Sequence, residues 1–195
     1  MHRGNSLAGL AIAAGAGVLL AASSAGAQSF VHRPGDHASG LEVELHGIIA
    51  YSVWGNATAP GVGLRFGIPL MRNGFIGSIN NGVALGIGAD LYFWPDWVDQ
   101  GHVHAFRTGL SVPVMLQWSF YLAEHFSFFI EGGVAATFGF WDGYYNDCGS
   151  GAVVLCYLTP GAAIGGRWHW TGGARYPAFT FRVGFPSGLT LGISF

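Results

Sequence analysis

Residues 61–70 read GVGLRFGIPL, and their alternation is the clearest signal of the fold. Large apolar side chains occupy every second position, and Arg65 stands between them on the opposite parity. Successive side chains of an extended strand point to opposite faces, so a period of two indicates a β-strand. The stretch predicts a strand with one apolar face, formed by Val62, Leu64, Phe66, Ile68 and Leu70.

The same alternation recurs through the rest of the chain after residue 39. It predicts strands at about 40–54, 61–70, 82–94, 107–121, 126–141, 156–169, 177–185 and 188–195. Eight is the smallest even number of strands that closes into a membrane barrel of the bacterial type. We therefore predict an all-β fold, a closed eight-stranded antiparallel up-and-down β-barrel over residues 40–195.

The acids and arginines of these strands all fall on the face opposite the large apolar residues. A charge facing lipid near the membrane centre costs about 2–4 kcal/mol, whereas a charge inside a barrel can form an ion pair. We expect a buried charge network that fills the lumen, with a gated or narrow polar path as the alternative. The set balances four acids against four arginines: Glu42, Glu44, Arg65, Asp90, Arg107, Glu131, Arg167 and Arg182.

The composition indicates whether the apolar face of the wall is turned outward, toward lipid, or inward. The chain is 51% hydrophobic and only 9% charged, and it has eight arginines but no lysine. Its polar faces carry mostly Gly, Ala and Ser, which is too little charge for a solvated surface. We therefore predict a transmembrane barrel, with a soluble periplasmic barrel that binds an apolar ligand as the alternative. An interfacial aromatic belt is predicted from Tyr51, Trp54, Tyr92, Trp94, Trp97, Trp118, Tyr121, Trp141, Tyr144, Tyr145, Trp168 and Trp170.

The first 27 residues are typical of a secretory signal peptide. His2 and Arg3 precede an apolar run, and Ala25-Gly26-Ala27 forms a small-x-small pattern before Gln28. A retained membrane anchor is the alternative. Cleavage after residue 27 would leave residues 28–39 as a short periplasmic segment before the barrel.

Two cysteines in an exported chain suggest one disulfide, between Cys148 and Cys156. A metal pair or two free thiols are the alternatives. His102 and His104 are also spaced for a metal, since residues two apart on a strand share a face. A solvent-exposed loop that happens to contain two histidines explains that pair more simply, so no metal and no cofactor are expected.

No motif in the chain points to catalysis. His46, His125 and His169 are scattered, and no serine stands in a setting typical of a hydrolase. No Lys-Ser/Thr follows the glycines between Gly82 and Gly88, so they do not form a phosphate loop. A net charge of −2 argues against nucleic acid as a partner. We expect a protein that is not an enzyme.

The C-terminal residues 188–195 read GLTLGISF, an alternating strand that ends in Phe. This pattern, in Leu189, Leu191, Ile193 and Phe195, resembles the assembly signal of bacterial outer-membrane barrels. Residues 112–133 resemble the central hairpin of small OmpA/OmpX-like barrels, with a short turn at Ala123 and Glu124. The resemblance implies a monomer in the outer membrane of a Gram-negative bacterium. It also implies insertion by the barrel-assembly machinery.

The resemblance places both termini in the periplasm and so orients the connections. Those at about 55–60, 95–106, 142–155 and 186–187 would face outward, and those at about 71–81, 122–125 and 170–176 would face the periplasm. The expected role is structural, or a surface interaction with an unknown ligand through the outer loops. A narrow, porin-like channel for small solutes and a lipid A-modifying enzyme are the alternatives.

Overall fold

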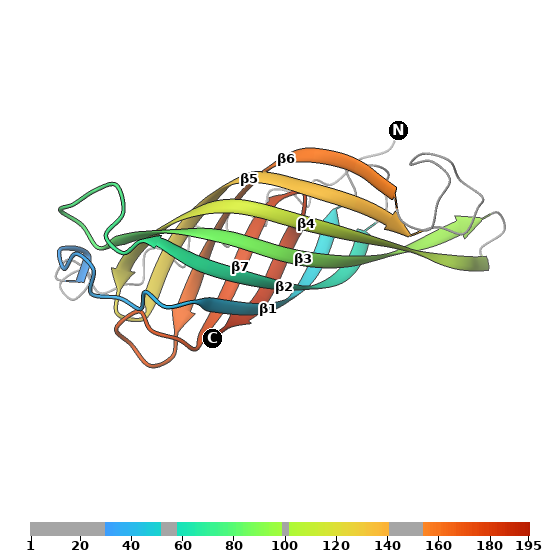
Figure 1. The fold of residues 1–195 in the computed structure, drawn as a ribbon. Helices are drawn as coiled ribbons and strands as arrows, with labels where there is room; N and C mark the ends of the chain where they lie inside the picture. The colour runs from blue at the N-terminus through green and yellow to red at the C-terminus, as the bar shows by residue number, and fades with distance from the viewer. Residues whose placement is uncertain (1–29, 52–57, 99–101, 141–153) are drawn as a thin grey trace, which may run out of the picture.

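The chain forms one closed barrel of eight antiparallel strands, with each strand paired to its neighbours in sequence (Figure 1). The computed structural model describes residues 30–51, 58–98, 102–140 and 154–195, with side chains at 50–58, 94–107 and 139–157 left undescribed. The predicted fold class is confirmed. The strands are β1 (Glu42–Tyr51), β2 (Thr58–Met71), β3 (Asn81–Val98), β4 (His102–Ala123), β5 (Phe126–Phe140), β6 (Val154–His169), β7 (Ala178–Phe185) and β8 (Gly188–Ser194).

Pairing of the first strand with the last closes the barrel. Leu45 lies opposite Ile193, and the backbones of Val43 and Phe195 exchange hydrogen bonds of 3.0 and 2.8 Å. The link between β7 and β8 is only Pro186 and Ser187, and Gly188 has a φ of 70° that a residue with a side chain rarely adopts. The C-terminal residue is thus part of the closed wall.

The connections fall into two groups at opposite ends of the barrel. Residues 72–80, 124–125 and 170–177 join strands at one end, which we call the turn end, and residues 30–40 and Phe195 lie at this end too. At the other end the β3–β4 hairpin projects beyond the barrel (Figure 1). The prediction of a loop over 95–106 was wrong, because β3 continues to Val98 and β4 begins at His102.

The wall has a polar inner face and an apolar outer face. Every described acidic or basic side chain of the strands is at most 6% exposed. Large apolar side chains on the same strands are 37–61% exposed: Leu45, Ile49, Val62, Leu64, Phe66, Ile68, Ile87, Val114, Leu116, Ile130, Val134, Ile164, Phe179, Val183, Leu191 and Ile193. We call these outward residues the apolar belt. Among the residues described, no helix is long and apolar enough to cross a membrane.

Among the side chains that the structure describes, three aromatic or apolar ones depart from the predicted outer face. Tyr92 and Tyr121 are only 4% and 7% exposed, so they do not belong to a surface belt. They share the parity of the inward residues Asp90 and Ser119, and the pattern of the strand outweighs the preference of tyrosine for an interface. Val83 is 3% exposed, and it lies opposite Met71, where the register between β2 and β3 shifts.

Candidate functional site in the barrel lumen

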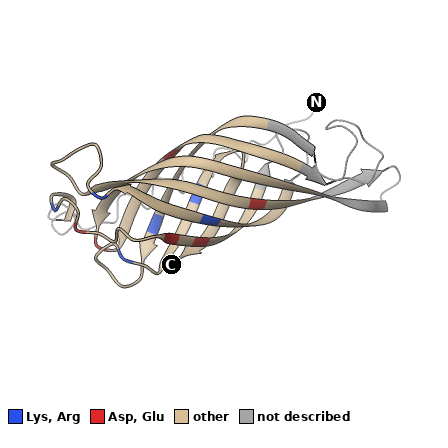
Figure 2. Cartoon of the chain, viewed as in Figure 1, with Lys and Arg blue, Asp and Glu red and all other residues tan. Residues whose placement is uncertain are grey.

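Six charged or ionisable side chains meet in the lumen as a closed circuit, which we call the lumen ring. They are Glu44, His46, Arg65, Asp90, Glu131 and Arg182, from strands β1, β2, β3, β5 and β7. Figure 2 shows that charged positions on the strands gather along the middle of the barrel, apart from those on loops at the turn end.

Arg182 is the central cation of the lumen ring. Its two terminal nitrogens contact both carboxylate oxygens of Glu44 at 2.8 and 3.0 Å, and its Nε lies 3.0 Å from Oε2 of Glu131. Arg65 continues the circuit, with one terminal nitrogen 3.2 Å from the same oxygen of Glu131 and the other 3.5 Å from Oδ2 of Asp90. A two-pronged arginine–carboxylate contact is among the strongest ion pairs that proteins form.

His46 completes the lumen ring between two carboxylates. Its Nε2 is 3.0 Å from Oδ1 of Asp90, and its Nδ1 is 3.2 Å from Oε1 of Glu44. Only the doubly protonated imidazolium can present a proton to both, since a neutral imidazole has one N–H. With His46 charged, three cations balance the three carboxylates of the ring.

Phe129 fills the lumen between the lumen ring and the turn end. The ring of this fully buried side chain lies 4.7 Å from the guanidinium carbon of Arg167 and 5.1 Å from that of Arg182. An arginine over an aromatic face gains cation–π attraction, which strengthens when water is excluded. The side chains therefore block the barrel here, as expected for an eight-stranded lumen that is only wide enough for side chains.

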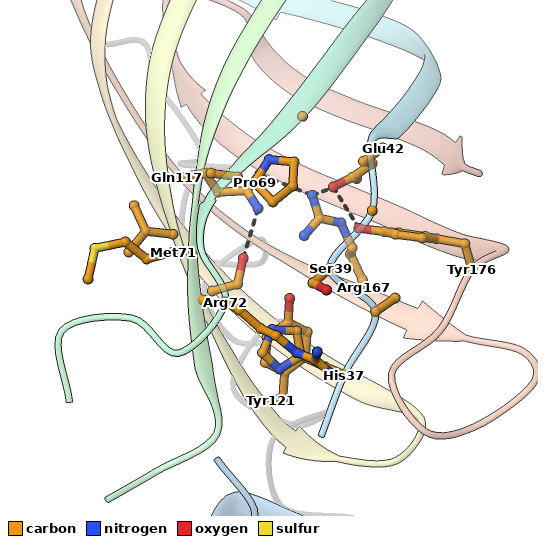
Figure 3. Close-up of a pocket in the computed structure, with 17 residues that line it drawn as sticks. His37, Ser39, Glu42, Pro69, Met71, Arg72, Gln117, Tyr121, Arg167 and Tyr176 are labelled. Atoms are coloured by element: carbon orange, nitrogen blue, oxygen red, sulfur yellow. Dashed lines mark hydrogen bonds and ion pairs between the residues drawn. The ribbon is translucent and has the colours of Figure 1, made fainter. Parts of the chain in front are cut away.

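A polar cavity of about 30 Å³ lies between Phe129 and the turn end. Arg167 is held there by Glu42 Oε1 at 2.7 Å and by Gln117 Oε1 at 3.0 Å (Figure 3). The Tyr176 hydroxyl donates to Glu42 Oε2 at 2.8 Å, and burial raises the pKa of Tyr176, so this proton stays in place. The cavity has room for about one or two water molecules.

Residues 30–40, which we call the N-terminal segment, close the turn end of the lumen. Phe30 is 1% exposed and packs with Tyr121 and Ala174. The His37 ring stacks on Tyr121 with ring centres 3.8 Å apart, and its Nδ1 lies 2.7 Å from Oδ1 of Asn80. Backbone hydrogen bonds from Asn80 to Val31 and from Ala38 to Ala174 fix both ends of the segment.

The docking of the N-terminal segment should depend on pH through His37. Burial lowers the pKa of His37 below its usual 6.5, with the Arg72 cation acting in the same direction, while Asp36 and the contact with Asn80 oppose it. A histidine with a lowered pKa stabilises the docked state fully above about pH 6.5 and loses that contribution as the pH falls below it. The ratio of the amide hydrogen-exchange protection of Ala38 at pH 8 to that at pH 5 should therefore be larger than in a His37→Phe variant, whose ring cannot charge. Equal ratios for the two proteins would contradict this role of His37.

Ser127 and His169 form a pair that the sequence did not suggest. Ser127 Oγ lies 2.9 Å from His169 Nε2, and His169 Nδ1 lies 3.0 Å from the backbone oxygen of Arg175. This is the contact of a hydrolase nucleophile with its base, but the partner of Nδ1 is a backbone carbonyl and not a carboxylate. Ser127 is 0% and His169 1% exposed. The pair therefore has no surface for a substrate and ties β5 to the 170–177 loop.

The other residues singled out in the sequence lie outside the lumen ring or outside the described part of the chain. Glu42 and Arg167 pair in the polar cavity, away from the lumen ring. Arg107 lies in the projecting part of β4, where its side chain is outside the description. The predicted signal peptide and Cys148 also lie outside the described residues. The signal peptide and the disulfide between Cys148 and Cys156 therefore stay predictions.

Comparison of the sequence with known proteins identified no relative. No protein-family model and no curated protein sequence matches the chain. Within the described ranges, no three His, Cys, Asp or Glu side chains are grouped so that they could hold a metal ion. The contacts that the structure shows in the lumen are ion pairs and hydrogen bonds, which stabilise the barrel.

Proposed function

We propose that the chain is an integral outer-membrane β-barrel with a filled lumen and a structural or surface-interaction role. The observation that carries the proposal is the inverted polarity of the wall. Leu45, Val62 and Val183 are more than half exposed, whereas Arg182 and Glu44, on the same strands, are buried. In water an exposed apolar surface of this extent is unfavourable, but in lipid it is the required outer face. A closed barrel also leaves no strand edge with unpaired backbone groups in the hydrocarbon.

The filled lumen supports a structural or surface role over a channel. Phe129, the two arginines stacked on it and the lumen ring occupy the path that a solute would take. An arginine cannot lose its proton in a protein, so its charge remains as a barrier in the lumen. The inaccessible Ser127 and His169 likewise give no support to a lipid-modifying enzyme.

The β3–β4 hairpin supports interaction at the end opposite the turn end. Among the described residues, pairing of β2 with β3 extends to Tyr92, and pairing of β4 with β5 extends to Thr108. Beyond these residues β3 and β4 continue as a two-stranded ribbon (Figure 1). Along residues 93–98 and 102–107 no third strand of the described chain is paired with them, and such edges can accept a strand from another molecule.

Fractionation of expressing cells tests the membrane assignment. We expect the protein in the outer membrane, with faster gel migration before boiling than after, because the closed barrel of β1–β8 resists detergent until it is heated. A variant lacking residues 188–195 cannot close the barrel and should show no shift. Recovery of the full chain as a soluble periplasmic protein without detergent would refute the proposal in favour of a soluble binder.

Epitope tags test the orientation of the barrel. A tag inserted between β3 and β4 should be reached by antibody on intact cells, because the hairpin projects from the end opposite the N-terminal segment and Phe195. A tag inserted after Gly77, in the 72–80 loop, should be reached only after the outer membrane is permeabilised. The reverse result would show that the turn end faces outward.

A further inference from the structure

The loop that joins β2 to β3, residues 72–80, presents an apolar tip although it lies beyond the strands. Phe75 is 60% and Ile76 39% exposed, while the neighbours Arg72, Asn73 and Ser78 are polar and exposed. Most exposed apolar side chains of the chain lie on the strands themselves. An exposed pair on a polar loop therefore needs an explanation of its own.

Asn81 holds this loop in a fixed shape. Its amide nitrogen donates to the backbone oxygens of Ile76 and Ile79 at 2.7 and 2.9 Å, and its Oδ1 accepts a hydrogen bond of 2.9 Å from Trp118 Nε1. Gly74 allows this approach, since a Cβ there would clash with Oδ1 of Asn81. The buried side-chain amide of Asn81 therefore holds the tip in one position.

The fixed loop lies against the outer side of the wall. Gln117 and Ser119 are buried and share a hydrogen bond inside the barrel, so Trp118 between them points outward. Phe75 contacts Trp118 edge-on, with ring centres 5.3 Å apart. Trp118 continues the row to Phe120 at 4.6 Å, and Phe120 to Phe128 at 6.3 Å. An aromatic row therefore runs from the loop tip along β4 to β5.

We propose that the 72–80 loop is a lateral membrane anchor, whose tip at Phe75 and Ile76 inserts among lipid headgroups and the adjoining acyl segments. The inference rests on the proposed function and adds a lipid-binding element to it. Continuity favours lipid as the occupant, because the tip extends the aromatic row and that row adjoins Leu116 and Ile130 of the apolar belt. Aromatic side chains at the boundary of hydrocarbon and water are stabilised there by their apolar bodies.

The charges at the turn end agree with a lipid boundary at this level. The described exposed acids and bases of the chain are His32, Arg33, Asp36, Arg72, Glu124, His125 and Arg175, and all lie on the loops or the N-terminal segment of this end (Figure 2). The first solvated charges thus appear where the apolar belt ends. Arg72 begins the loop, so an arginine stands beside the tip where lipid phosphates would lie.

Site-specific fluorescence in lipid vesicles tests the anchor. A fluorescent amino acid replaces Ile76 in one variant, Leu64 of the apolar belt in a second, and exposed Ser78 of the same loop in a third. Position 76 should lose fluorescence to lipids spin-labelled near the headgroup, and less to lipids labelled near the chain end. Position 64 should be quenched by the deeper labels, and position 78 mainly by aqueous iodide.

The outcomes separate the anchor from the proposed function. Lipid quenching at position 64 with iodide quenching at position 76 would overturn the anchor and leave the membrane barrel standing. Protection of position 76 from both quenchers would assign the tip to a protein partner or a second copy, and would also overturn it. No lipid quenching at position 64 would remove the membrane barrel and the anchor together. Retention of the heat-dependent gel shift shows that each variant has folded.

Discussion

Arg182→Ala should lower the free energy of unfolding by about 3–5 kcal/mol, the usual cost of removing one partner from a buried ion pair. The side chain is 2% exposed and contacts Glu44 twice and Glu131 once. Its loss leaves two buried carboxylates without the cation that joins them. It also removes one of the two cations that stack on Phe129.

The measurement is urea unfolding of the barrel in lipid vesicles, followed by tryptophan fluorescence. Arg72→Ala is the matched control, because it removes an exposed arginine that makes one hydrogen bond to the backbone of Gly35. Its cost should stay within about 0.5 kcal/mol. Equal unfolding midpoints for the Arg182 and Arg72 variants would show that the lumen ring contributes no stability.

Gly63→Ala should disrupt the lumen ring through a single methyl group. A Cβ at position 63 would clash with Nε2 of His46 and Oδ1 of Asp90, the two atoms that close the circuit between β1 and β3. Both side chains are buried and cannot move toward solvent. Overpacking of this kind costs about 1–3 kcal/mol, and separation of His46 from Asp90 adds to that.

Gly132→Ala is the control, since this glycine also lies within a strand but a Cβ there would meet nothing within 4 Å. It should be neutral or slightly stabilising, because alanine has less freedom in the unfolded chain. A Gly63→Ala barrel that unfolds at the same urea concentration as the Gly132→Ala barrel would contradict the geometry of the circuit.

The fold could be predicted because the wall of a barrel is a local pattern. A period of two specifies a strand and its two faces, and the closed barrel follows from the number of strands. The β3–β4 hairpin was missed because Trp94 and Pro95 interrupt the pattern that the preceding residues keep. Backbone pairing between β3 and β4 continues to Val98 and His102, beyond the residues where apolar and polar side chains alternate.

The site could be predicted only in part. Parity assigned Glu44, Arg65 and Arg182 to the interior, but parity does not say which side chain meets which. The contact of Glu44 with Arg182 spans 138 residues and exists only in the closed barrel. His46 was left aside as an isolated histidine, although its parity matches that of Glu44, because a histidine has no fixed charge to count.

The route by which the lumen ring is built has a consequence for biogenesis. Its members come from five strands, and Arg182, which joins Glu44 to Glu131, belongs to the next-to-last. A nascent or truncated chain without β7 holds two carboxylates that have lost their main cation. A chain that includes β7 and β8, with Val43 bonded to Phe195, balances the charges of its own lumen. The circuit thus ties charge balance in the lumen to closure of the barrel, because Glu44 and Glu131 share Arg182 only once β7 is in place.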